Sequence, residues 1–361
     1  MGAPYGSKDD MLSRLLERGR DVAARTAGLA SEFSRQRSAV RETLEDAGLI
    51  HAVDPSLISE TRMPSLTAVD GACITDSRAI GDICAAVGVA VGDDGAPANE
   101  VWMDCVARNA RNKDIVTGIM SSMEVRLAAT ADTDVVMVDG SLTSALVNIS
   151  KAVLHSSRGR TDLEGQALAL VGREMRDAVM EVLTSKRFVA LPKYTTTNDE
   201  FRDYLPTGLE DFDGRTVATM ALRPGEMMTL FESDEVRKRS FEEKKRQIGN
   251  ALKFSDAEYA EFVRVSTSVV YSYYRPHPWT PAFRFDFPEA LREDIDQGRL
   301  VLKAIHDTTL SPGIREPLPL YVADNFAKQI SVGVSPIMDM AAVDYNEDDE
   351  ALILMIMGYR T

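Results

Sequence analysis

Two aspartates in this 361-residue chain have the same sequence context: each directly follows a short apolar run and directly precedes a glycine. Asp139 follows the run Val-Val-Met-Val at residues 135–138, and Asp70 follows Leu-Thr-Ala-Val at residues 66–69. Each run indicates a short buried strand. A carboxylate beside buried apolar residues is costly unless it is paired or binds a metal ion. An Asp-Gly turn after an ordinary strand is the simpler interpretation of either site alone, but the repetition of Val-Asp-Gly favours a shared metal site.

Three further residues have types that suit such a site. Glu124 lies at the edge of the apolar stripe of a predicted helix over residues 104–131. Lys193 comes just after an apolar strand and before a run of hydroxyl side chains, where an ammonium group could hold a phosphate. Asp324 lies near the start of a predicted C-terminal helix over residues 320–330. A solvated Glu124 and an exposed loop lysine are the alternatives that remain open for the first two.

The elements that must position these residues alternate between short apolar strands and longer helices. An antiparallel meander is predicted to follow the strand of Asp70, which ends at that aspartate. The patterns indicate strands at residues 66–69, 83–91, 100–103, 135–138, 187–191, 263–274 and 283–287, and a helix at residues 163–183. This alternation is typical of an α/β fold with a mixed central sheet flanked by helices. We expect Asp70 and Asp139 to lie on adjacent strands, less than about 10 Å apart, so that their carboxylates can bind a pair of metal ions between them.

Three segments lie outside this pattern. Residues 1–55 form an N-terminal helical arm in which Gly19 and Gly28 mark possible breaks. The arm is either an oligomer surface or a helix folded back on its own domain. Residues 199–261 are irregular and rich in both charge signs, which indicates a charged helical insertion at the surface. An apolar run at residues 351–357 predicts a C-terminal strand.

Composition limits the classes of function. The formal net charge is −15, which argues against a protein that coats nucleic acid by bulk electrostatics. No window approaches the roughly 18 apolar residues of a membrane span, and the first residues lack a secretory pattern, so we expect a cytoplasmic protein. The three cysteines and four histidines have no spacing typical of zinc sites.

The order of these features resembles the NurA family of nucleases, which have an RNase H-like core and act with the hexameric HerA ATPase on DNA ends. The resemblance covers about residues 60–357. Three motifs carry it: Val-Asp-Gly at residues 69–71, Val-Asp-Gly-Ser-Leu at 138–142, and Pro-Leu-Pro-Leu-Tyr-Val-Ala-Asp at 317–324. The resemblance implies that residues 56–361 form an RNase H-like nuclease domain.

The resemblance also implies a metal site. Asp70, Glu124 and Asp139 match the metal ligands of the family, and Asp324 stands where the family usually offers a histidine. Hard carboxylate oxygens suit Mn²⁺ or Mg²⁺. Two such ions about 3.5–4 Å apart activate water and stabilise the leaving oxygen of a phosphodiester. Lys193 would then contact a phosphate. The aromatic residue that the family tends to have before the last helix has no equivalent here, because Leu318 occupies that position.

These matches imply a Mn²⁺- or Mg²⁺-dependent deoxyribonuclease that processes single- or double-stranded DNA ends, in double-strand break repair or phage defence. The implied partners are DNA, a HerA-type hexameric ATPase and a second copy in a homodimer. Two alternatives stay open. One is an actin-like ATPase, for which Gly71-Ala72-Cys73 would make a poor phosphate loop. The other is a catalytically inactive RNase H-like adaptor of an ATPase complex.

Overall fold

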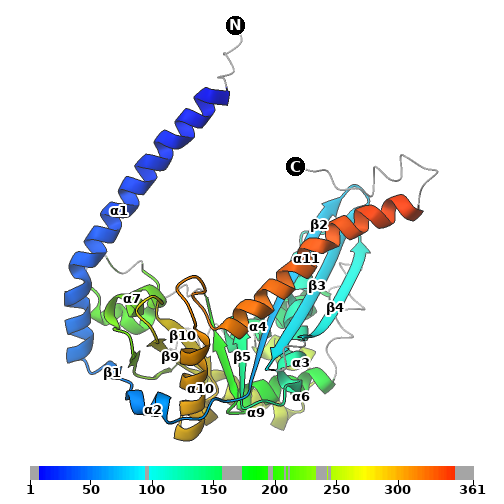
Figure 1. The fold of residues 1–361 in the computed structure, drawn as a ribbon. Helices are drawn as coiled ribbons and strands as arrows, with labels where there is room; N and C mark the ends of the chain where they lie inside the picture. The colour runs from blue at the N-terminus through cyan, green and yellow to red at the C-terminus, as the bar shows by residue number, and fades with distance from the viewer. Residues whose placement is uncertain are drawn as a thin grey trace.

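A single mixed sheet runs through the computed structural model of the protein (Figure 1). The structure describes residues 8–93, 97–156, 173–193, 198–206, 209, 212–232, 242 and 245–345. Nine of the ten described strands follow the order β1-β7-β9-β10-β6-β5-β2-β3-β4, and the tenth, β8, lies off this path and pairs with β9. The predicted α/β fold with a mixed central sheet flanked by helices is therefore confirmed.

Five strands make the half of the sheet that carries Asp70 and Asp139. They are β2 (Leu66–Arg78), β3 (Gly81–Gly92), β4 (Pro97–Val106), β5 (Val135–Asp139) and β6 (Phe188–Leu191). The first three form an antiparallel meander, and β5 and β6 continue the sheet parallel to β2. This arrangement places the end of β5 beside the middle of β2.

Two sequence boundaries differ from the prediction because pairing outweighs the local turn signal. We expected the first strand to end at Asp70, but β2 continues to Arg78 because every residue from Thr67 onward pairs with β3. Asp70 is thus an interior residue of a long strand. The helix predicted from residue 104 begins later, as α3 (Asn112–Thr130), because β4 extends through Val106 along β3.

The other half of the sheet is built from five further strands of two to six residues each. These are β10 (Phe283–Phe287), β9 (Val270–Arg275), β7 (Glu226–Met228), β8 (Phe231–Glu232) and β1 (Ile50–Ala52). The described part of residues 199–261 therefore contributes to the sheet and is not merely an irregular insertion. It also forms η1 (Asp199–Tyr204) and α7 (Gly214–Ala221). The predicted strand over residues 263–274 was wrong in its first half, which belongs to α9 (Asp256–Thr267).

Helices cover both faces of the sheet because β5 and β6 are apolar on both sides. Val136 and Val138 pack with α3, α4 (Leu142–Ser156), α6 (Arg173–Thr184) and α9. Val135 and Met137 pack on the opposite face with α2 (Pro55–Ser59), α10 (Ile295–Thr308) and α11 (Leu318–Tyr345). Alternate residues of a strand point to opposite faces, so a continuous apolar run is what a doubly covered strand requires. Of the helix predicted at 163–183, the structure describes the part from residue 173.

The N-terminal arm is one helix, α1 (Lys8–Asp46), which projects from the body of the protein (Figure 1). Neither Gly19 nor Gly28 interrupts it. Among the α1 side chains whose burial the structure describes, only Val40 and Leu44 near the C-terminal end are buried, and they pack with α7. Arg41 holds this end by donating to the Ala221 carbonyl and by an ion pair with Glu226.

The last described helix, α11, is longer than the predicted 320–330 and runs along β2 and β3 (Figure 1). Its far end is fixed by Arg78, whose side chain is buried and pairs with Asp76 at 2.8 Å and with Asp339. Ser335 adds a hydrogen bond of 2.9 Å to Asp76. The predicted strand at residues 351–357 lies outside the described residues. Among the described helices, none has the length and apolar character of a membrane span.

Candidate metal centre

Three carboxylates from different elements meet at the end of β5. Asp70 lies in β2, Asp139 is the last residue of β5 and Asp324 lies in the second turn of α11. Each offers an oxygen atom, and these three oxygens lie within 4.8 Å of one another. The parallel register, in which Val69 pairs with Val138, brings the two strand residues together. The prediction that Asp70 and Asp139 lie close on adjacent strands is confirmed.

The glycines that follow the two strand aspartates have different structural roles. Gly140 adopts a φ of 90°, a conformation that glycine reaches without steric cost, and its N–H donates to Asp139 Oδ1 at 2.9 Å. The N–H of Gly71 donates to Asp70 Oδ1 at 2.7 Å, but here the strand continues. A Cβ atom on Gly71 would lie 2.7 Å from Glu124 Oε1. Gly71 therefore leaves space for the carboxylate of Glu124 beside the strand.

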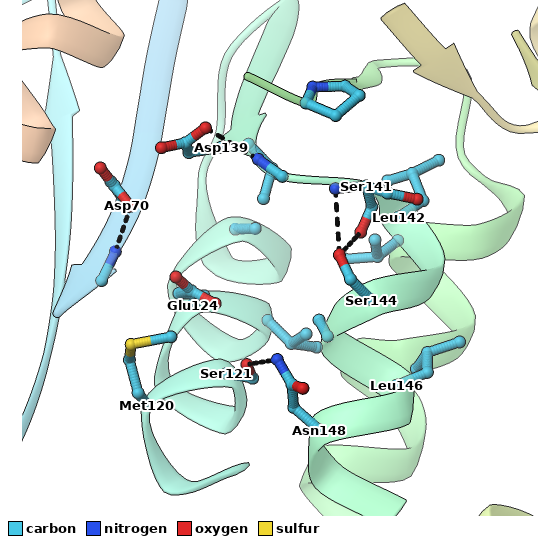
Figure 2. A pocket seen from close by; sticks show the side chains of 18 of the residues that line it. Asp70, Met120, Ser121, Glu124, Asp139, Ser141, Leu142, Ser144, Leu146 and Asn148 are labelled. Atoms are coloured by element: carbon cyan, nitrogen blue, oxygen red, sulfur yellow. Dashed lines mark hydrogen bonds between the residues drawn. The ribbon is translucent and has the colours of Figure 1, made fainter. Parts of the chain in front are cut away.

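Glu124 approaches the cluster from α3 and lies beneath Asp70 and Asp139 in Figure 2. Its carboxylate is not among the three that meet within 4.8 Å. Burial, followed by the charge of Asp139, raises the pKa of Glu124 to about 8. Burial, followed by the charges of Asp139 and Glu124, raises the pKa of Asp70 to about 9. The chain thus crowds acids where their ionised forms are unfavourable without additional positive charge.

Lys193 supplies part of that charge from the position that the sequence predicted, just beyond β6. Its Nζ lies 2.9 Å from Asp139 Oδ2, 3.2 Å from Glu316 Oε2 and 3.5 Å from Asp324 Oδ1. Burial acts to lower the pKa of Lys193, but the hydrogen bond and charge of Asp139 and the charge of Glu316 outweigh burial and raise it. Lys193 is therefore a fixed cation among the acids.

Two residues of the site were missed by the sequence analysis. Glu316 precedes α11 and faces Lys193, and Lys328 lies one turn after Asp324, with its Nζ 2.7 Å from Asp324 Oδ2. Burial acts to raise the pKa of Asp324, but Lys328 and Lys193 outweigh it and hold the pKa below its ordinary value. The four-residue spacing of Asp324 and Lys328 on one helix predicts their ion pair and could have been used. No sequence pattern pointed to Glu316 beyond its closeness to the motif at 317–324.

The donor set fits a hard divalent cation. Asp70 Oδ2 is buried, and no backbone amide, hydroxyl or amine of the described residues donates a hydrogen bond to it. A buried carboxylate oxygen without a donor is stabilised either by a proton of its own or by a bound cation. The three clustered ligand atoms are all carboxylate oxygens, which suit Mg²⁺ and Mn²⁺. Asp70, Asp139 and Asp324 can therefore hold such an ion, with Glu124 beside them.

A cavity of about 450 Å³ opens next to this cluster. Its polar wall contains Asp70, Glu124, Asp139 and Lys193, and it continues between α3 and α4, where side chains are mostly apolar (Figure 2). The Ser141 hydroxyl lies 3.1 Å from that of Thr143 and accepts a hydrogen bond from its N–H at 3.3 Å. The acids thus line one wall of this cavity.

Comparisons with known proteins agree on one family. The family model described as the NurA domain matches residues 64–329. The crystal structure of the NurA nuclease from Sulfolobus solfataricus has a TM-score of 0.59 and 15% identity, over 94% of this chain and 98% of that chain. A crystal structure of NurA bound to dAMP and manganese has a TM-score of 0.52 and 12% identity, over 85% and 92%. A crystal structure of NurA with manganese has a TM-score of 0.51 and 13% identity, over 86% and 94%.

At these identities the solved structures establish a shared fold, and the family model establishes the sequence relationship. No protein of curated function matches the chain. The matched range contains all five residues that the sequence analysis selected, from Asp70 to Asp324.

Proposed function

The chain belongs to the NurA family, and we propose that it is a metal-dependent deoxyribonuclease that hydrolyses phosphodiester bonds at DNA ends. The observation that carries this proposal is the meeting of Asp70, Asp139 and Asp324 within 4.8 Å, with the Lys193 ammonium beside them. Three carboxylates, one of them with a buried oxygen to which no N–H or hydroxyl of the described residues donates, suit divalent metal ions better than a purely structural ion pair.

Each residue has a distinct task in the proposed reaction. Asp70, Asp139 and Asp324 would ligate Mn²⁺ or Mg²⁺, and Glu124 would complete the ligand set from the floor of the cavity. The bound ions would supply an activated water molecule and stabilise charge on the leaving oxygen. Lys193 keeps its proton and can exchange a carboxylate contact for an oxygen of the scissile or a neighbouring phosphate.

The choice of metal and substrate draws on two kinds of support. Two of the solved relatives are crystal structures of NurA with manganese, and in one of them NurA is also bound to dAMP. The hard oxygen ligands of this chain favour the same class of ion. We accordingly assign Mn²⁺ or Mg²⁺ as the cofactor and single- or double-stranded DNA ends as the substrate.

The proposal extends to partners. With a net charge of −15 the chain has little unaided affinity for the DNA backbone, which favours a HerA-type hexameric ATPase that delivers DNA to it. We propose that it acts as a homodimer in the cytoplasm, in double-strand break repair or phage defence. Exposed apolar residues on α1, among them Met11, Leu15 and Leu16, offer a surface for association. A monomer by light scattering that forms no complex with the ATPase would contradict this part.

Cleavage of linear DNA tests the chemical proposal. Labelled single- and double-stranded substrates are incubated with Mn²⁺ or with EDTA, each with and without the ATPase. We expect cleavage with Mn²⁺, none with EDTA, and a near-complete loss in Asp139→Asn. The matched control is Glu42→Gln, which removes an exposed carboxylate of α1 and should cleave as the wild type does. Wild-type inactivity in every condition would refute the nuclease and favour the inactive adaptor, and full activity in EDTA would refute the metal site.

A further inference from the structure

The loop between β9 and β10, residues 276–282, lies at the same edge of the sheet as the metal centre. Strand β10 runs antiparallel to β6, with Asp286 opposite Ala190, so the start of β10 lies beside the end of β6. Arg215 of α7 joins the two segments directly. It donates to the carbonyl of Ala282 at 3.0 Å and to the carbonyl of Lys193. The loop and the site lysine are therefore held by one side chain.

This loop presents an exposed aromatic pair. Trp279 is 40% exposed, which is unusual for so large an apolar side chain. Its indole stacks on the ring of His277, with centroids 4.6 Å apart and planes 10° apart. His277 Nε2 lies 2.9 Å from the carbonyl oxygen of His306 at the end of α10. The stacked pair is thus anchored on its histidine side and exposed at the tryptophan.

The loop is held rigidly. Arg275 donates to the carbonyls of Pro278 and Thr280, both at 3.1 Å. The Thr280 hydroxyl donates to the His277 carbonyl at 3.0 Å and accepts from the His277 N–H at 3.3 Å. Prolines at positions 276, 278 and 281 restrict the backbone further. A surface that is ordered before binding loses little conformational entropy when a ligand arrives.

Positive charge lies at the base of the loop, although the whole chain is acidic. Arg275 also donates to the carbonyls of Thr219 at 3.3 Å and Leu222 at 2.9 Å, and Arg37 of α1 donates to that of Met220 at 2.8 Å. Neither guanidinium has a carboxylate partner in the part of the chain that the structure describes. Both positive charges therefore contribute a favourable electrostatic potential for a nearby phosphate, although the Arg275 guanidinium itself is engaged by backbone carbonyls.

We propose that Trp279, supported by His277, is a stacking platform for an unpaired base of single-stranded DNA beside the metal centre. This inference rests on the proposed nuclease function. An aromatic ring can stack on the face of any base, whereas both faces of a base inside a duplex are already stacked on neighbouring bases. Stacking also supplies affinity that does not depend on neutralising phosphates, which suits a chain with a net charge of −15. The platform selects an unpaired strand without reading its sequence.

The fluorescence of Trp279 tests the proposal directly. Trp102 and Trp279 are the two tryptophans of the chain, so Trp102→Phe leaves Trp279 as the sole indole reporter. A thymidine oligonucleotide is titrated into this variant in EDTA, where binding occurs without cleavage. We expect saturable quenching, and far weaker quenching with a blunt duplex of the same length. Fluorescence anisotropy of a labelled oligonucleotide, with both tryptophans present, should show about tenfold weaker binding for Trp279→Ala and near-normal binding for Trp279→Phe.

The control is Ile295→Ala, which removes a 70% exposed apolar side chain at the opposite end of α10 and should not change binding. Unchanged Trp279 emission on adding the oligonucleotide, or unchanged affinity in Trp279→Ala, would overturn the proposal. A response of Trp279 to the ATPase or to a second copy, with none to the oligonucleotide, would overturn it as well. Since the binding assay needs no catalysis, an inactive wild type would defeat the nuclease assignment without deciding this outcome.

Discussion

The buried acids of the metal centre should make the metal-free protein less stable as the pH rises, and Asp70→Asn should weaken that dependence. The pKa is about 9 for Asp70 and about 8 for Glu124 in the folded chain. Both groups ionise near pH 4 in an unfolded chain. A carboxyl whose pKa is raised by folding contributes stability below its unfolded pKa and loses it as the pH climbs towards the folded value. The loss therefore extends from about pH 4 to about pH 9.

The slope follows from the number of protons. Between about pH 5.5 and pH 7.5 these two carboxyls hold protons in the folded chain that they have released in the unfolded chain, and together they contribute a slope of about 3 kcal/mol per pH unit. Asp70→Asn removes one of them, so its slope should be smaller by about 1.4 kcal/mol per pH unit. For a chain of 361 residues this difference is about 2 °C in Tm per pH unit.

Urea titrations and thermal scans in EDTA, at several pH values across this range, measure the two slopes. Glu42→Gln, which removes an exposed carboxylate of α1, is the matched control and should follow the wild type. Saturating Mn²⁺ should reverse the trend for the wild type, because a cation replaces the protons. Parallel slopes for Asp70→Asn and the wild type in EDTA would refute the crowding of charges that the site geometry implies.

Three further predictions concern metal binding and packing. Mn²⁺ at 100 times its Kd should stabilise the wild type by about 2.7 kcal/mol in calorimetry but hardly stabilise Asp139→Asn, and equal stabilisation would exclude Asp139 as a ligand. Arg78→Met leaves its two partly exposed acid partners without this cation and should cost about 1–3 kcal/mol in urea, with faster hydrogen exchange in the distal half of α11; unchanged exchange there would contradict it. Gly118→Ala places a Cβ atom 2.3 Å from the Cβ of Ala152 and should cost about 1–3 kcal/mol, whereas Gly298→Ala meets nothing within 4 Å and should not destabilise; equal stabilities would contradict the close packing of α3 on α4.

The sequence predicted the elements whose pattern is local. The apolar runs before Asp70 and Asp139 located two central strands, since a strand covered on both faces needs apolar residues at every position. The stripe that contains Glu124 located α3. Asp139 and Lys193 follow strand ends, Glu124 lies on a helix face, and Asp70 directly follows a local apolar run, which is why the sequence could predict these four site residues.

The errors arose where tertiary pairing outweighs local preference. An Asp-Gly pair is a turn signal, yet Gly71 continues β2 because a twelve-residue antiparallel ladder with β3 holds it extended. Strand β7 has three residues, too few to show a period of two. Glu316 belongs to the site only because the connection before α11 passes over Lys193, and no spacing in the sequence encodes that contact. Chain division at residue 55 and the roles of the site residues remain predictions.

Because Asp70 lies inside β2, metal binding depends on the correct register between β2 and β5. Because side chains alternate between faces, a slip of one residue between β2 and β5 would keep an apolar sheet but turn Asp70 away from Asp139. Such a misaligned chain could be compact and still be unable to collect its ligands. The affinity for a divalent ion therefore reports the alignment of two strands that are far apart in sequence. Molecules that fold with the wrong register would be recognised because they do not bind the metal ion.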